Sequence, residues 1–240
     1  MKKSLLLLIL LSVQILVAQS AATVENPPSK ATDLVLFSFG MEQPIPIGTL
    51  SNSGELNINL AQDLDFISEE AKSNFMSDTA FILFSNCVGS NDMLSEAENV
   101  KAAKGGYISL STKENPYSGL LFMVTDENMV PWIESYGDVD AILGSYFEVV
   151  YMESDFSYQG ECTSNASSTE KEIIETQYTY DLNLKAGFNF IEYKIESVEE
   201  FEIPSMYEEN VFEKIDKPTK ISITSSQSTL PNTKWIGKYF

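Results

Sequence analysis

The sequence has 240 residues, of which 43% are apolar, and its 35 acidic and 15 basic side chains give a formal net charge of −20. A surface this acidic repels phosphate groups, which argues against nucleic acid and anionic lipid headgroups as partners. The chain contains no histidine and no arginine. Serine–histidine–acid triads, cysteine–histidine dyads, histidine-containing zinc sites and bidentate arginine clamps are therefore excluded.

Residues 1–20 have the layout of a secretory signal peptide. Two lysines precede an apolar run over residues 5–18, and the small side chains of Ala18 and Ser20 favour cleavage near Ser20. The apolar run is shorter than the roughly 18 to 20 residues that a membrane-spanning helix needs. An uncleaved N-terminal anchor is the alternative. We expect a secreted, periplasmic or cell-surface protein with no integral membrane segment after cleavage.

Cys87 and Cys162 are the only cysteines in the chain. An exported chain meets an oxidising compartment, so we expect these two residues to form a disulfide. The alternative is two unconnected thiols, with Cys87 buried after the apolar run over residues 80–84. Two cysteines cannot build a four-cysteine zinc site.

The N-terminal part of the expected mature chain predicts a leader followed by strands. Residues 21–32 contain Pro27 and Pro28, which favour a flexible leader. The apolar run over residues 34–39 predicts a buried strand. Residues 45–60 alternate with period two around a Ser-Asn-Ser-Gly turn, which predicts a β-hairpin with one wet face.

The periodicity changes after this hairpin. Apolar side chains at four-residue spacing predict a helix over residues 67–76, with Ser68 as its N-cap. The run over residues 79–86 predicts a buried strand. Residues 92–104 precede two glycines and predict either a second short helix or a solvated loop. The next strand candidates are residues 107–112 and 119–125.

Residues 142–195 contain the clearest β pattern. We expect a long hairpin with its first arm over residues 142–158, a polar loop over residues 159–171 that holds Cys162, and an alternating second arm over residues 174–183. A third antiparallel strand should follow beside it. The acidic segments over residues 126–140 and 197–217 are expected to be loops with short helical pieces. Two further strands should close the chain, over residues 221–224 and 234–240.

Regularly spaced short strands with turn signals predict a mainly β fold. We expect an antiparallel β-sandwich or partly closed barrel with one or two short helices. No internal repeat or sharp linker divides the mature chain. We therefore expect a single domain over residues 33–240.

Aromatic side chains that we expect to be exposed are candidates for stacking on sugars or peptides. These candidates are Trp132, Tyr136, Tyr158 and Tyr207. The alternative is packing within the core, which is common for aromatic residues on strands. Tyr178 and Tyr180 share a side with Ile174 in the second arm, so we expect them to be core residues and place any binding function in the flanking acidic loops.

Acidic and amide side chains near Trp132 offer the oxygen ligands that Ca²⁺ prefers. The candidate ligands are Asp126, Asn128, Asp138 and Asp140, with Glu127 nearby. Their spacing does not match the twelve-residue EF-hand loop, and a solvated acidic loop is the alternative. We expect no other cofactor.

These observations favour a non-catalytic binding or structural protein whose ligand is a glycan, a peptide or another protein. Such a binding protein should present a concave aromatic patch. One alternative is a carboxylate-only hydrolase, which would need two carboxylates about 5 to 10 Å apart across a cleft. The aromatic C-terminus at Phe240 suggests a small outer-membrane β-barrel as a second alternative, although strand faces rich in Glu and Lys argue against it.

Overall fold

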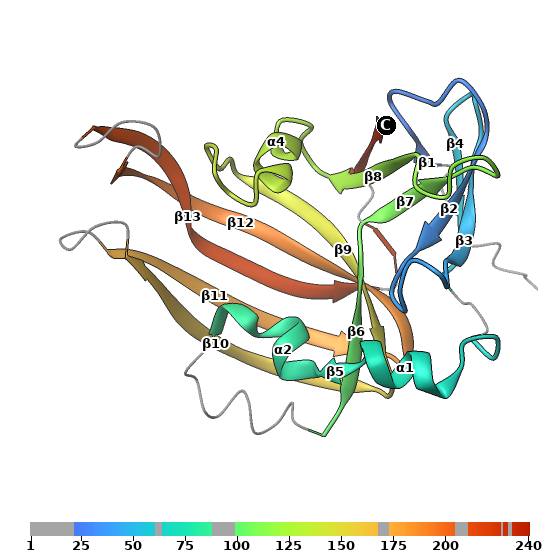
Figure 1. The fold of residues 1–240 in the computed structure, drawn as a ribbon. Helices are drawn as coiled ribbons and strands as arrows, with labels where there is room; N and C mark the ends of the chain where they lie inside the picture. The colour runs from blue at the N-terminus through green and yellow to red at the C-terminus, as the bar shows by residue number, and fades with distance from the viewer. Residues whose placement is uncertain are drawn as a thin grey trace, which may run out of the picture.

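The structure, a computed structural model, describes residues 22–60, 64–87, 99–167, 173–204, 211–226, 228–229 and 232–240. The predicted signal peptide, residues 92–98 of the second predicted helix and the candidate Tyr207 lie outside these ranges. The fold is mainly β, as predicted, with one large mixed sheet that does not close and three short helices (Figure 1). No helix in the described ranges has the length and apolar character needed to cross a membrane.

The elements follow one another along the chain without an internal repeat. The first are β1 (Ala22–Thr23), β2 (Thr32–Leu36), β3 (Ile45–Leu50), β4 (Glu55–Ile58), α1 (Glu69–Phe75), β5 (Ser77–Asp78), α2 (Thr79–Leu83), the 3₁₀ turn η1 (Ser85–Cys87) and β6 (Lys101–Gly106). The others are β7 (Ile108–Ser111), β8 (Gly119–Val124), α4 (Met129–Glu134), β9 (Gly144–Met152), β10 (Phe156–Ser167), β11 (Ile173–Leu184), β12 (Gly187–Pro204), β13 (Phe212–Ser226) and β14 (Lys234–Tyr239).

The strands lie in the order β1-β4-β3-β2-β7-β8-β9-β12-β13-β11-β10, with β14 beside β8 and β6 beside β9. The middle strands β8, β9 and β12 are covered on both faces. In β8, Leu121 and Met123 pack into one core, and Phe122 and Val124 pack into another. Burial on both faces explains why β8 is a nearly continuous apolar run instead of an alternating one.

Two cores therefore flank the middle strands. The N-terminal core includes Leu34, Leu36, Phe39, Ile45, Ile47, Leu50, Ile108, Leu110, Leu121, Met123, Phe147, Val149, Phe190 and Trp235. The C-terminal core includes Leu83, Phe84, Phe122, Val124, Met129, Ile133, Val150, Met152, Phe156, Tyr180, Leu182, Leu184, Ile191, Ile195, Ile221 and Ile223. Burial of these apolar side chains provides the main stabilisation of the fold.

Helix α1 is confirmed, whereas the strand predicted over residues 79–86 is wrong. The Ser68 hydroxyl caps α1 by accepting a hydrogen bond from the Ala71 backbone N–H at 3.1 Å. Residues 79–83 form α2, because burial follows one helical face: Ala80 and Leu83 are buried and Phe81 is 71% exposed. A short apolar run does not distinguish a buried strand from a helix on its own.

Part of the segment predicted as a flexible leader is paired with the rest of the fold. Strand β1 lies antiparallel to β4, and Val24 is buried in the N-terminal core. The Asn26 side chain accepts a hydrogen bond from the Gly237 N–H at 2.9 Å and donates to the Gly237 carbonyl. The Asn26 amide thus makes the two hydrogen bonds to Gly237 that a neighbouring strand would make, next to two prolines that lack the N–H needed for strand pairing.

Two segments predicted as loops are strands. Strand β10 extends through residues 159–167 of the predicted polar loop, and β12 and β13 include residues 197–204 and 212–217 of the predicted acidic loop. Their polar faces are paired across the ladder, as by Lys214 with Glu200. These ends project from the sheet body (Figure 1), so an apolar alternation is not required there. Residues 101–104, predicted as helix or loop, are likewise strand β6.

The predicted order of three adjacent strands is also wrong. The first arm predicted over residues 142–158 is divided between β9, which pairs with β12, and the start of β10, which pairs with β11. Strand β13 lies between β12 and β11. Strand β13 is parallel to β11 and antiparallel to β12, so the sheet is mixed. Alternation defines which residues form a strand but not which strand lies beside it. The helical turn expected around Trp132 is confirmed as α4.

Candidate functional site

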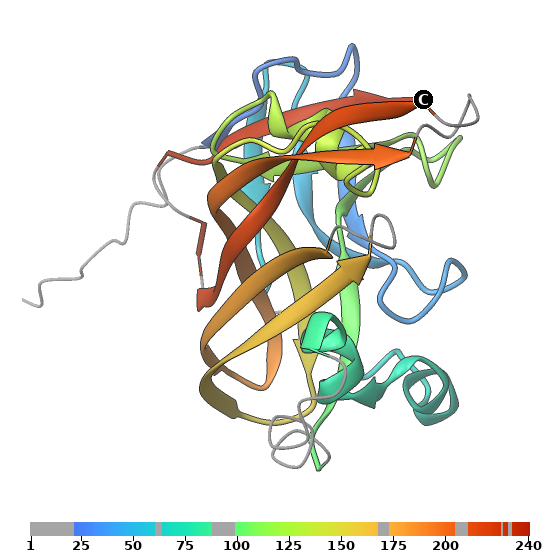
Figure 2. The ribbon, with the colours of Figure 1, turned by 90° about the vertical axis from the view of Figure 1, so that its left-hand side faces the viewer.

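The β10–β11 and β12–β13 hairpins diverge from a common end and separate toward their tips (Figures 1 and 2). Pairing between β11 and β13 covers only Gln177–Asp181 with Lys220–Thr224. Beyond this ladder the Thr176 hydroxyl donates to the Pro218 carbonyl at 2.8 Å. Proline lacks an N–H and cannot donate a ladder hydrogen bond of its own.

A cavity of about 520 Å³ lies where the hairpins separate, under the loop that follows α4. It is lined by Asn86, Trp132, Tyr136, Gly137, Tyr146, Ala166, Ile174, Thr176, Tyr178, Tyr193, Ile203, Lys217, Pro218 and Ile221. Five of these side chains are aromatic and come from α4 and its loop, β9, β11 and β12. Among the described lining residues, Lys217 is the one with a charge.

Three of the aromatic side chains form a connected group, namely Trp132, Tyr146 and Tyr193. Tyr146 and Tyr193 are direct partners across the β9–β12 ladder, and their rings stack with centroids 4.9 Å apart and planes 9° apart. The Trp132 ring meets Tyr146 edge-on with centroids 5.9 Å apart. Burial raises the pKa of both the Tyr146 and the Tyr193 hydroxyls well above the ordinary tyrosine value. These phenols therefore stay neutral near pH 7.

Hydrogen bonds hold the α4 loop against strand β13. The Lys217 ammonium donates to the Gly137 carbonyl, and the Asp216 N–H donates to Asp140 Oδ1 at 3.0 Å. The Ala141 N–H donates to the Asp216 carbonyl at 2.8 Å. This side of the cavity is thus a fixed wall formed by two segments that are far apart in the sequence.

The C-terminal end of α4 places an aromatic side chain at the cavity mouth. Tyr136 has a φ of 54°, the positive value of a left-handed backbone, and is followed by Gly137 with a φ of 87°. The Gly137 N–H donates to the Trp132 carbonyl at 2.9 Å, which ends the helix. The left-handed conformation costs about 1 to 2 kcal/mol for a residue other than glycine. Tyr136 nevertheless occupies it with 95% of its surface exposed.

The Trp132 indole N–H is a buried donor with no hydrogen-bond partner among the described residues. Its nitrogen lies beside Gly137, since a Cβ added to that glycine would be 3.6 Å from Nε1. Leaving a buried donor unpaired costs about 1 to 3 kcal/mol. This N–H is therefore a donor available for an acceptor oxygen atom of a bound molecule.

Glu148 is an acidic residue in the otherwise apolar strand β9. It shares a strand face with Tyr146 and Val150, which belong to the C-terminal core. Burial raises the pKa of the Glu148 carboxyl, while Lys104 and a hydrogen bond from Tyr107 lower it in part. The charge of Glu148 contributes to the raised pKa values of Tyr146 and Tyr193, but Glu148 is not one of the lining residues of the cavity.

Cys87 and Cys162 lie at disulfide distance, with Cα atoms 5.8 Å apart. This pair connects η1 to strand β10 next to Asn86, one of the lining residues. Phe84, at the end of α2, packs its ring edge-on against Tyr158 and Tyr180 with centroids 4.9 Å away in each case. The α2 segment is thereby fixed over the β10–β11 hairpin.

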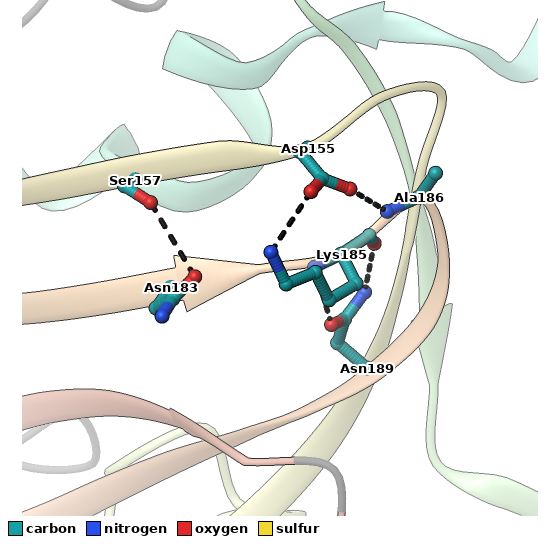
Figure 3. Close-up of polar contacts among 6 residues, drawn as sticks. All are labelled: Asp155, Ser157, Asn183, Lys185, Ala186 and Asn189. Carbon is teal, nitrogen blue, oxygen red and sulfur yellow. Dashed lines mark hydrogen bonds and ion pairs between the residues drawn. The ribbon is translucent and has the colours of Figure 1, made fainter.

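A polar corner fixes the common end from which the two hairpins diverge (Figure 3). Asp155 accepts hydrogen bonds from the Lys185 ammonium at 2.8 Å and the Ala186 N–H at 2.9 Å. The fully buried Asn189 accepts from the Lys185 N–H and donates to the Lys185 and Gly187 carbonyls. These bonds satisfy the backbone where the chain leaves β11 and enters β12, so the corner is a structural feature.

The structure brings some of the predicted site residues together and separates others. Trp132 and Tyr136 line one cavity, whereas Tyr158 packs against Phe84 and Tyr180. Tyr180 is a core residue as predicted, but Tyr178 and Ile174 line the cavity. Sequence analysis did not select Tyr146, Tyr193 or Lys217, because only strand pairing brings these residues to one place.

The candidate calcium ligands have separate roles. Asp126 Oδ1 accepts from the backbone and side-chain N–H groups of Asn128 at 2.9 Å, and Asp140 bonds to β13. The Asp138 N–H donates to Ser135 Oγ at 3.1 Å. Within the described residues, no three His, Cys, Asp or Glu side chains gather as a metal-binding group. The structure therefore does not assemble these carboxylates into one site.

Comparison of the chain with models of known protein families, with curated proteins and with solved structures gives no match.

Proposed function

We propose that the chain is a non-catalytic binding protein whose ligand presents a ring or another flat apolar group to the cavity. One observation carries this proposal: aromatic side chains from four segments converge on a single cavity of about 520 Å³. Small-molecule sites generally occupy about 300 to 1,000 Å³ and are lined mainly by apolar and aromatic side chains. Aromatic faces stack on rings and bury a large area for each side chain.

The backbone of Tyr136 supports the same proposal. A left-handed conformation persists at a residue other than glycine only where the surrounding structure imposes it, and such residues cluster at binding and catalytic sites. Here the conformation holds a ring at the mouth of the cavity, almost fully exposed. Contact with a ligand would bury this ring.

A hydrolase that uses two carboxylates is less well supported. Such an enzyme would place two acids on opposite sides of the cleft. The described lining residues include Lys217 but no Asp or Glu. This composition favours binding over hydrolysis.

The fluorescent probe N-phenyl-1-naphthylamine tests the proposal because it consists of linked aromatic rings without a charge. We expect saturable fluorescence enhancement with the wild-type chain. Tyr136→Gly should weaken binding about tenfold, because it removes one stacking face worth about 1 kcal/mol or more. The same change should raise the free energy of unfolding by about 1 kcal/mol, because glycine adopts the left-handed backbone without strain.

Tyr117→Ala provides the matched control. Tyr117 is another exposed tyrosine, but its ring packs near Phe37 and Phe240, and it is not a lining residue of the cavity. Its replacement should leave probe affinity unchanged. Absence of saturable binding, or equal affinities for the wild-type chain and Tyr136→Gly, would overturn the proposal. If the probe binds as expected, competition by cellotetraose or by the tripeptide Gly-Trp-Gly would distinguish a glycan from a peptide ligand.

A further inference from the structure

Lys217 differs from the other lysines of the β12–β13 hairpin. Lys214 pairs with Glu200, and Lys220 pairs with Glu196 at 3.1 Å. Lys217 makes no ion pair with a described residue, although Glu199 lies opposite it in the ladder. Its ammonium instead donates to the Gly137 carbonyl in the cavity wall. An ammonium has three N–H donors, so this bond leaves donors available to a ligand.

A second donor lies on the other side of Gly137. The Trp132 Nε1–H is buried and unpaired among the described residues, and it lies close to the position that a Cβ on Gly137 would occupy. Tryptophan and lysine side chains donate hydrogen bonds but cannot accept them. The described wall around Gly137 therefore presents donors to the cavity, without a carboxylate to compete for them.

We propose that the ligand carries an anionic group of the carboxylate or sulfonate class next to its ring, and that this group binds between Lys217 Nζ and Trp132 Nε1. The inference rests on the proposed function, since the aromatic cavity holds the ring. A hydrogen bond to a charged group contributes about 1.5 to 3 kcal/mol, more than a neutral one does. The anion also gives the buried indole N–H the acceptor that it lacks.

The overall charge makes this proposal selective. With a net charge of −20 the chain repels anions in general. Any preference for an anionic ligand over an uncharged one must therefore come from the local donors. The competing explanation is that Lys217 serves only to connect the α4 loop to β13, in which case the charge of the ligand would not matter.

Two fluorescent probes separate these explanations, because 1-anilinonaphthalene-8-sulfonate differs from N-phenyl-1-naphthylamine only by its sulfonate. We expect the wild-type chain to bind the sulfonate probe about tenfold more tightly than the uncharged probe. Lys217→Met should remove this preference by weakening the sulfonate probe about tenfold more than the uncharged probe. Lys214→Met, an exposed lysine on the same strand, should leave both affinities unchanged.

Trp132→Phe is the second variant, and it keeps an aromatic ring while removing the indole donor. It should weaken the sulfonate probe about threefold more than the uncharged probe, because both probes lose the same part of the stacking area but only the sulfonate loses a donor. This variant carries the test if Lys217→Met does not fold, as judged by its thermal melting curve. Both probes are titrated well below the melting temperature, because loosened proteins bind the sulfonate probe nonspecifically.

The outcomes for the two proposals are distinguishable. Equal wild-type affinities for the two probes, or equal losses for both probes in the variants, would overturn the anionic group. Binding of the uncharged probe that depends on Tyr136 would still support the proposed cavity. If neither probe binds in a way that depends on Tyr136, the proposed function itself fails. A sulfonate preference that disappears in both variants supports the inference.

Discussion

The two cores share strands β8, β9 and β12 but differ in the partly buried side chains packed against them, which are rich in tyrosine only at the C-terminal core. The N-terminal core is largely aliphatic, and Leu34, Leu36, Ile45 and Ile47 have 0% of their surface exposed. The C-terminal core contains Tyr180 and is continuous with partly buried tyrosines and Trp132 at the cavity. Aliphatic side chains fill space closely and carry no polar atom, whereas buried tyrosine and tryptophan require partners for their polar ends.

Neighbouring residues of β9 illustrate what this difference means. Phe147 is buried in the N-terminal core, whereas Glu148 points to the opposite face and shares it with the aromatic group. One face of the same strand thus contributes closely packed apolar area, and the other holds polar groups around a cavity. We infer that the N-terminal core mainly stabilises the sheet and the C-terminal core bears the binding site.

The largest effect is expected from removal of the predicted disulfide. Replacing Cys87 and Cys162 with serine opens a loop of 75 residues and should lower the free energy of unfolding by about 4 kcal/mol. Urea denaturation measures this loss. Because both residues belong to the C-terminal core, hydrogen exchange should accelerate more in β10 and β11 than in β2 and β3. Two alkylated thiols in the unreduced wild-type chain would contradict the disulfide.

A matched pair of isoleucine truncations compares the cores directly. Ile47→Ala removes a fully buried side chain from the N-terminal core and should cost about 2 to 5 kcal/mol of unfolding free energy. Ile174→Ala at the cavity should cost about 1 kcal/mol or less, because its side chain is partly exposed and borders open space. Urea denaturation of both variants checks this difference. Equal losses would remove the distinction between the cores.

Glu148→Gln should stabilise the protein at neutral pH. The pKa of Glu148 is raised by burial, so its ionised form is less favourable in the folded state than in the unfolded chain. The contribution of Glu148 to the free energy of unfolding therefore falls as the pH rises from the ordinary glutamate pKa through the raised pKa of the folded protein. The variant should exceed the wild type in melting temperature at pH 8, with a gap that closes toward pH 4. A variant less stable at pH 8 would show that Lys104 and Tyr107 outweigh burial.

The smallest effect, of the opposite sign, is expected for Asp155→Asn at the corner. Hydrogen bonds from Lys185 and the Ala186 N–H lower the pKa of Asp155. The contribution of Asp155 to the free energy of unfolding is present above the ordinary aspartate pKa. It is lost as the pH falls through the lowered pKa of the folded protein. The variant should melt at a slightly lower temperature at neutral pH and match the wild type in strong acid. A pH-independent difference would show that the carboxylate charge has no role.

Local patterns predicted much of the secondary structure. Period-two alternation correctly indicated β3, β4, β11 and the first half of β12, and Ser68 correctly indicated the start of α1. The strand candidate over residues 234–240 is β14. The predictions failed where burial did not follow the pattern assumed. Residues 79–83 bury one helical face, and the outer ends of β12 and β13 are rich in exposed charged residues, among which few side chains, such as Ile215, are buried.

The candidate site was predictable only in part. Trp132 and Tyr136 were identified because large aromatic side chains in an acidic loop are unusual enough to suggest a ligand. Tyr178 was assigned to the core because it shares a strand side with Tyr180, but the divergence of β11 from β13 leaves Tyr178 at the cavity. Such divergence depends on where pairing ends, and no residue pattern within one strand reports it.

The sequence by itself determined that the chain is rich in β-strands, strongly acidic, and without the histidine and arginine chemistry of many enzymes. These properties follow from residue types and from the two-residue period of a strand, which are local. Only the tertiary structure decided that β13 lies between β11 and β12, and that Trp132, Tyr146, Tyr193 and Lys217 meet at one cavity. Strand order and hairpin divergence depend on contacts between residues far apart in the chain, and alternation within a strand does not specify its neighbour.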